Sequence, residues 1–198
     1  MSLSPEQLGA LIDNVTADII AHADELTALD SAIGDADHGI NMKRGAEAVR
    51  AEREALTVKP VSDALKAIGT RLVMTVGGAS GPLYGTLALS LAKEWPGNAF
   101  PEALGKATDA VAARGKSNIG QKTMLDVLYP LVAALKSGTP VAEIPAVADR
   151  AAEATIPVKA TRGRASFLGD RSIGHMDPGA RSVALIATAI VRTLGDKS

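Results

Sequence analysis

Residues 4–19 read SPEQLGALIDNVTADI, and this segment carries both a helix start signal and a helical spacing of apolar side chains. Ser4 can cap a helix, Pro5 suits its first position, and Gln7 completes a capping box. The apolar residues that follow recur every three or four positions: Leu8, Leu11, Ile12, Val15 and Ile19. The segment therefore predicts an amphipathic helix whose apolar side faces a core.

The same spacing returns along most of the chain. It predicts further helices at residues 40–56, 60–76, 83–95, 101–114, 124–135, 141–155 and 177–194, separated by breaks rich in Gly, Pro and Asp. No segment sustains the alternation of a strand, and neither an internal repeat nor a linker divides the chain. We therefore expect an all-α protein of about eight helices, with residues 1–198 forming one domain.

Composition excludes several classes of function. The chain has 198 residues, a net charge of −1 and 3% aromatic residues, so we expect no nucleic-acid binding. It contains no cysteine, which excludes disulfides, thiolate nucleophiles and cysteine metal sites. The first residues lack the form of a signal peptide, and no stretch is long enough to span a bilayer, so we expect a cytoplasmic protein that does not bind membranes.

Three carboxylates lie close together in the first glycine-rich break. Asp30, Asp35 and Asp37 would repel one another unless a cation lay among them, and Gly34 and Gly39 let the backbone fold so that their oxygens converge. Oxygen ligands favour Mg²⁺, Ca²⁺ or Mn²⁺ over zinc, and a small set of carboxylates suits Mg²⁺ bound with phosphates. The alternative is that these residues are only caps and turns.

A second break, GGASGPLYG at residues 77–85, directly precedes a predicted helix. Small residues there expose backbone N–H groups, and a helix N-terminus favours anions, so the segment fits a phosphate. Ser80 adds a hydroxyl that can bond a phosphate oxygen. The alternative is a simple turn between helices.

The third break, residues 163–179, is long, irregular and rich in glycine. It offers Arg164, Arg171 and His175, and arginine matches the geometry of phosphate. We interpret it as a lid or binding loop, with a solvated basic loop as the alternative.

A fourth segment, Gly115-Lys116-Ser117, resembles the end of a P-loop. Position 110 is Ala where that motif needs Gly, and no strand precedes it, so the P-loop hypothesis is rejected.

Five stretches taken together resemble the L subunit of dihydroxyacetone kinases. They are GDADHG at 34–39, GGASGPLYG at 77–85, RGK at 114–116, KTMLD at 122–126 and the segment 163–179. They follow the order of that family over most of the chain. Phe167 stands where Tyr is usual and Asp170 where Glu is usual, and neither change removes an expected ligand.

The resemblance implies an eight-helix antiparallel barrel or bundle with the nucleotide site at one end. It implies that Asp30, Asp35 and Asp37 are catalytic and hold two Mg²⁺ ions that bridge the phosphates of ADP or ATP. The residues that it places around the nucleotide are His38, Gly39, Ile40, Asn41, Gly78, Ala79, Ser80, Gly81, Gly115, Met124, Arg164, Asp177, Pro178 and Gly179.

The resemblance also implies that the chain is an incomplete kinase. The family binds dihydroxyacetone on a separate K subunit, and the bound ADP of its multi-component members is rephosphorylated by a phosphotransferase-system protein. Members that use ATP directly exist as well. Two alternatives stay open: an L-type subunit for another ketose such as erythrulose, and an ADP-loaded regulator that binds a transcription factor.

Overall fold

The computed structural model describes residues 3–195, and within that range it is built of helices and contains no strand. The α-helices are α1 (Pro5–Ala21), α2 (Ala23–Ile33), α3 (His38–Ala51), α4 (Arg53–Thr57), α5 (Val61–Thr75), α6 (Ser80–Glu94), α7 (Phe100–Gly115), α8 (Leu125–Lys136), α9 (Ile144–Glu153) and α10 (Pro178–Gly195). Three 3₁₀ helices accompany them: η1 (Trp95–Gly97), η2 (Val141–Glu143) and η3 (Arg164–Ser172). The prediction of an all-α fold is confirmed.

The helix start at Ser4 has the predicted chemistry. The Ser4 hydroxyl accepts a hydrogen bond from the Gln7 backbone N–H at 3.2 Å, and the Gln7 side-chain oxygen accepts one from the Ser4 N–H at 2.9 Å. Two N–H groups that the first turn leaves without helical partners are thereby satisfied. Pro178 begins α10, where its fixed φ suits the first helical turn and its missing N–H loses no bond.

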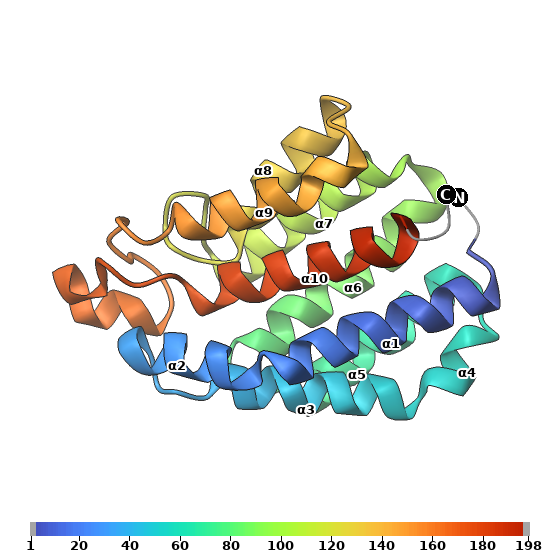
Figure 1. Ribbon diagram of the computed structural model, residues 1–198, viewed down its shortest axis with the longest axis horizontal. Coiled ribbons are helices and arrows are strands. Elements are labelled where there is room, and N and C mark those ends of the chain that lie inside the picture. Colours follow the sequence, from blue (N-terminus) through green and yellow to red (C-terminus); the bar gives the residue numbers. More distant parts are fainter. Residues whose placement is uncertain (1–2, 196–198) are drawn as a thin grey trace.

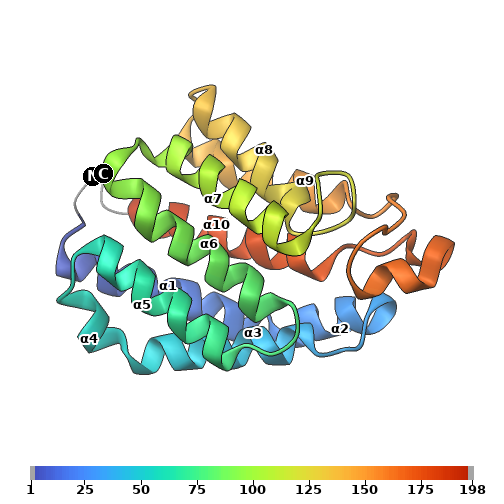
Figure 2. The same ribbon diagram turned by 180° about the vertical axis from the view of Figure 1, so that it is seen from behind.

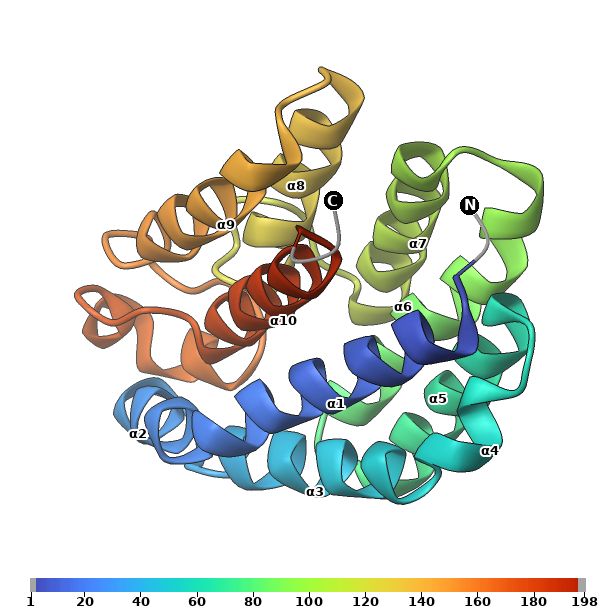
Figure 3. The same cartoon turned by 45° about the vertical axis from the view of Figure 1, so that its right-hand side comes forward.

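Eight of the helices form a closed series of neighbours. Helix α1 packs on α3, α3 on α5, α5 on α6, α6 on α7, α7 on α8, α8 on α9, α9 on α10, and α10 returns to α1 (Figures 1 and 3). The main core fills the space that these helices share, and buried side chains from α1, α2, α3 and α6 to α10 contribute to it. Fully buried alanines allow close helix contacts: Ala103, Ala107, Ala148, Ala180, Ala184 and Ala189.

Two smaller clusters hold the opposite ends of the molecule. Leu8, Ile12, Val49, Leu56 and Ala64 join α1, α3, α4 and α5. At the other end, Ile33 of α2 packs with Ala160 and Ala165. The second cluster attaches the segment between α9 and α10 to the end of α2 (Figure 1).

The structure corrects several predicted boundaries. It divides the chain into more helices than expected, because a bend at His22 separates α1 from α2 and another at Glu52 separates α3 from α4. Asp30 belongs to α2 rather than to the following break. The segment predicted to be irregular contains η3, which is interrupted at Gly169 with φ +57°. Among residues 3–195, no helix combines the length and apolarity that crossing a lipid bilayer needs.

Candidate nucleotide and metal site

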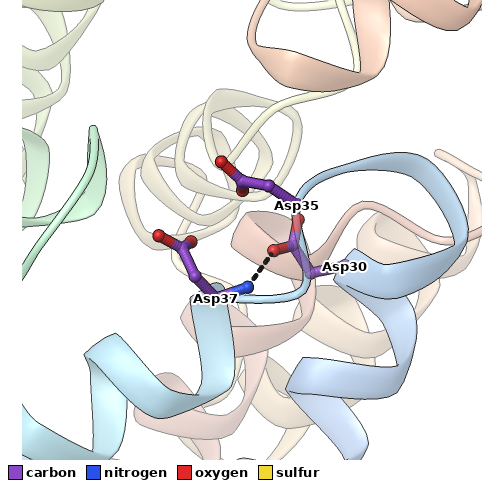
Figure 4. A group of neighbouring side chains, drawn as sticks. All are labelled: Asp30, Asp35 and Asp37. Atoms are coloured by element: carbon purple, nitrogen blue, oxygen red, sulfur yellow. Dashed lines mark hydrogen bonds between the residues drawn. The ribbon is translucent and has the colours of Figure 1, made fainter.

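Three aspartates converge where α2 ends and α3 begins. Each of Asp30, Asp35 and Asp37 offers a carboxylate oxygen, and these oxygens lie within 4.8 Å of one another (Figure 4). Asp30 is buried, Asp37 is half-buried and Asp35 is exposed. The cluster therefore opens toward solvent on one side.

The position of Asp30 follows from the backbone that surrounds it. Its Oδ2 accepts hydrogen bonds from the N–H groups of Asp37, at 2.8 Å, and His38, at 3.1 Å. A carboxylate at the N-terminus of α3 is favoured by these bonds and by the helix dipole. Gly34 is required at the turn, because a Cβ there would overlap the Asp30 side chain. Asp30 thus fixes both the loop and the first turn of α3.

The electrostatics of the cluster favour a cation. Burial raises the pKa of Asp37, and the negative charge of Asp35 raises it further. The donor set consists of carboxylate oxygens that share an open face, which fits a hard divalent cation such as Mg²⁺ and leaves room for water or phosphate ligands. The described residues at this position therefore fit the predicted metal, and metal binding stays a prediction.

The glycine-rich segment before α6 lies beside the start of α3, where Asp37 is the N-cap residue (Figure 2). A methyl group built on Gly78 would lie 3.6 Å from Oδ2 of Asp37, and one on Gly77 would lie 2.7 Å from Oδ1 of Asn41. Gly78 has φ +62°, a conformation that favours glycine. Ala79 is the N-cap residue of α6 and its side chain satisfies no N–H, so the first N–H groups of this helix are available to an anion next to the carboxylates.

A buried chain of hydrogen bonds joins this helix start to α3 and α10. His38 Nδ1 is hydrogen-bonded to the Ser80 hydroxyl and His38 Nε2 to the Ser182 hydroxyl, both at 3.0 Å. The Ser182 hydroxyl in turn bonds the Tyr84 hydroxyl at 2.6 Å. Burial lowers the pKa of His38 to about 4, although the charge of Asp30 opposes this effect, so the imidazole is neutral at pH 7. His38 therefore holds Ser80 by a neutral hydrogen bond.

Other predicted residues lie where the starts of α8 and α10 and the end of α7 come close to α6. A Cβ on Gly179 would lie 3.4 Å from the Met124 backbone nitrogen, so the start of α10 touches the start of α8. A Cβ on Gly115 would lie 3.4 Å from the Leu83 side chain, which belongs to α6. The ends of α6, α7, α8 and α10 thus approach one another near the aspartates.

Asp177 is a buried carboxyl at the start of α10. Its Oδ2 accepts a hydrogen bond from the Ala180 N–H at 2.7 Å. Burial raises its pKa to about 7, since the bond from Ala180 offsets only part of the cost of ionisation in the interior.

Four predicted residues have surroundings that the sequence did not indicate. Gly39 packs against α2, and Gly81 packs against the Val76 carbonyl. Ile40 is mostly exposed on α3. The Nε of Arg164 lies 3.1 Å from Oδ2 of Asp35, and the two form an ion pair. The expected place of Arg164 beside the nucleoside stays a prediction.

Lys122 is the residue that sequence reasoning did not single out. Its side chain is fully buried, and its ammonium donates to the backbone carbonyls of Thr155, Ile156, Val158 and His175. A lysine in a loop is ordinarily expected on the surface, and the sequence marks Lys122 only as one member of the 122–126 stretch. Its burial and its positive φ of 63° appear only in the structure.

These features define an all-helical protein with an acidic oxygen cluster beside a glycine-rich helix start. Residues 32–192 match the model of the DAK2 domain, and the chain therefore belongs to the DAK2-domain family.

Relatives and a solved structure agree with this assignment. The chain is 44% identical over 173 residues to the PEP-dependent dihydroxyacetone kinase 1, ADP-binding subunit DhaL, of Listeria innocua, covering 85% of this chain and 86% of that protein. It is 40% identical over 197 residues to the corresponding subunit of Escherichia coli, covering 92% and 94%. The dihydroxyacetone kinase from C. freundii in complex with AMP-PNP and Mg²⁺ has a similar fold, with a TM-score of 0.81 at 23% identity; the match covers 97% of this chain and 34% of that one.

Proposed function

We propose that this chain is the ADP/ATP-binding L subunit of a dihydroxyacetone kinase. It would pass a phosphoryl group to dihydroxyacetone held on a separate K subunit, with ADP rephosphorylated by a phosphotransferase-system protein. Two relatives that match the chain over most of both lengths are named ADP-binding subunits of PEP-dependent dihydroxyacetone kinases, which supports this role.

The observation that carries the proposal is the convergence of Asp30, Asp35 and Asp37 beside the first turn of α6. Carboxylates and helix N–H groups are opposite in sign, so one ligand that satisfies both must itself combine cations with an anion. A nucleotide with its divalent cations has this combination. We propose two Mg²⁺ ions, as the family resemblance implies; they would offset part of the roughly seven negative charges that three carboxylates and ionised ATP carry together.

Each part of the site has a distinct task in this proposal. The aspartates hold the cations, and the Ser80 hydroxyl and the N–H groups of α6 bind phosphate oxygens. Gly115, Met124 and Gly179 would form the walls beside the nucleoside, and the two glycines would allow close approach. The bound Mg²⁺ would supply neutralisation of the charge on the transferred phosphoryl group.

The segment around η3 borders the aspartates through the ion pair of Arg164 with Asp35, and it suits a protein partner. Ile119 in the loop before α8, Phe167 in η3 and Ile173 after η3 are exposed apolar side chains. Phe167 is 84% exposed, so a docked partner would bury it. The K subunit would dock there and bring its ketone to the open side of the aspartates.

Calorimetric titration with ADP tests the proposal. We expect binding with Mg²⁺ present and loss of binding in EDTA, and we expect Asp35→Ala and Asp37→Ala to lose both ligands. Glu47→Gln, which alters an exposed carboxylate on α3, is the control and should bind as the unmodified chain does. Undiminished ADP binding in EDTA would contradict the proposal.

Turnover assays identify the acceptor and the donor. The chain is mixed with a dihydroxyacetone-binding K subunit and supplied either with ATP or with phosphoenolpyruvate and the phosphotransferase proteins. We expect product with phosphoenolpyruvate, and we expect denaturation of the purified chain to release ADP. Turnover of erythrulose without turnover of dihydroxyacetone would replace the proposed acceptor.

A further inference from the structure

The buried ammonium group of Lys122 is surrounded by four backbone carbonyl oxygens. Its Nζ lies 2.7 Å from the Thr155 carbonyl oxygen, 3.4 Å from that of Ile156, 3.1 Å from that of Val158 and 2.5 Å from that of His175. An ammonium group has three N–H donors, so four carbonyl oxygens satisfy it fully with one bond shared. Burial lowers the pKa of Lys122, and the charges of Asp177 and Asp126 oppose this effect.

These four carbonyls belong to residues 155–175, the segment between α9 and α10 that leads to Asp177 and Gly179 in the proposed nucleotide site. Thr155 connects it to Asp177, because the Thr155 hydroxyl accepts a hydrogen bond from the Asp177 N–H at 3.0 Å. His175 lies two residues before Asp177. The ammonium therefore ties the backbone that follows α9 to the residue just before the turn that begins α10.

Lys122 itself belongs to the opposite wall. It lies two residues before Met124, in a loop that Asp126 also organises by accepting N–H bonds from Gly120 and Thr123 at 2.5 and 2.7 Å. Since Met124 touches Gly179, the lysine joins the two walls behind their point of contact. The aspartate cluster takes no part in this bridge and is held by the separate bonds to Asp30.

We propose that Lys122 is a positioning residue whose buried ammonium sets the separation of the two nucleoside walls, 122–126 and 175–179. This inference rests on the proposed nucleotide site. It predicts that loss of the ammonium weakens ADP binding through the nucleoside walls, and that a free ammonium ion of similar size and charge can replace it.

The test uses the intact chain and three substitutions. Lys122→Ala removes the ammonium and leaves space, Lys122→Met removes it and fills the space, and Lys59→Ala alters an exposed lysine as the control. ADP is titrated calorimetrically with Mg²⁺ in sodium chloride or in ammonium chloride of equal concentration. Helix content and the thermal midpoint, followed by circular dichroism, establish which variants are folded.

We expect both Lys122 variants to bind ADP more weakly, by up to about 10²-fold, as for other displacements of groups that position a ligand. Ammonium should restore much of the affinity of Lys122→Ala, and neither Lys122→Met nor Lys59→Ala should respond. If Lys122→Ala does not fold in sodium chloride, the same reasoning expects ammonium to restore its helix content.

Two results would overturn the inference. One is wild-type ADP affinity in Lys122→Met. The other is an ammonium effect of the same size in all proteins, because a general salt effect needs no site. Failure of the unmodified chain to bind ADP would instead contradict the proposed function.

Discussion

Replacing Asp37 with Asn should stabilise the folded chain in the absence of metal and abolish its stabilisation by Mg²⁺ and ADP. One carboxylate oxygen each of Asp37, Asp30 and Asp35 lie within 4.8 Å of one another. Two charges at about 4 Å repel by about 1 kcal/mol in water and by more beside a protein. The ion pair of Arg164 with Asp35 offsets part of this repulsion.

Removing the repulsion from the two neighbouring carboxylates should raise the free energy of unfolding by about 1–2 kcal/mol. This corresponds to a rise in thermal midpoint of about 2–8 °C for a domain of this size. An Asn at position 37 is nearly isosteric and keeps the backbone N–H that bonds Asp30, so local geometry should persist. Saturating ligand should stabilise the two proteins unequally. At a concentration of about 100 Kd it should stabilise the wild type by about 2.7 kcal/mol and the variant hardly at all.

The assay is urea unfolding followed by circular dichroism, in EDTA and then with Mg²⁺ and ADP. Glu47→Gln removes one exposed carboxylate from the same helix and should change the free energy of unfolding by less than about 0.5 kcal/mol. A loss of stability in Asp37→Asn without metal would refute the argument, because it would mean that the three carboxylates do not repel one another in the folded chain.

Three further predictions concern packing, a buried hydroxyl and pH. Gly39→Ala should cost about 2–3 kcal/mol of unfolding free energy in urea titrations, since its Cβ would overlap the Ala23 backbone carbonyl and force α3 from α2. Tyr84→Phe should lower stability by about 1–2 kcal/mol by the same measurement, because it removes the hydroxyl bonded to Ser182; an unchanged midpoint would contradict that bond. Burial raises the pKa of Asp177 from 3.8 to about 7, so its contribution to stability is present below about pH 4 and lost as the pH rises to about 7. Asp177→Asn should therefore lack this pH dependence, and parallel stability–pH curves for the two proteins would count against it.

Local chemistry made the helix starts predictable. The capping box needs only Ser4 and Gln7, three positions apart, and Pro178 restricts its own backbone. Such signals act within one turn, so they can be recognised without knowing the fold.

Helix ends that depend on distant partners were not predictable. Asp30 stays helical while its side chain accepts N–H bonds from residues seven and eight positions later. The bend at His22 has a local cause in part, since its Nδ1 lies 2.8 Å from the Asp18 carbonyl oxygen, but the apolar spacing alone gives no sign of it. Apolar periodicity indicates which side chains face the core. It does not indicate where a carboxylate, such as that of Asp30, accepts backbone N–H bonds from the following loop.

The candidate site was predictable to the extent that charge concentrates in the sequence. Asp30, Asp35 and Asp37 stand within eight positions, and mutual repulsion alone makes them conspicuous. Lys122 gives no such signal, because its carbonyl partners lie 33 to 53 positions further along the chain. The pairing of Arg164 with Asp35 likewise depends on how η3 packs against the end of α2.

The first and last helices of the series run side by side, with the start of α1 and the end of α10 at the end of the molecule opposite the turn between α2 and α3 (Figures 1 and 2). A bead or fluorophore attached to the start of α1 or the end of α10 would therefore leave the proposed nucleotide site unobstructed. Mechanical force applied between these two ends would separate α1 from α10 one contact after another. The pairs Asn14–Thr193 and Asp18–Arg192 should break first. Under load, unfolding should begin at the end where α1 starts and α10 ends, while the cluster of Asp30, Asp35 and Asp37 is still intact.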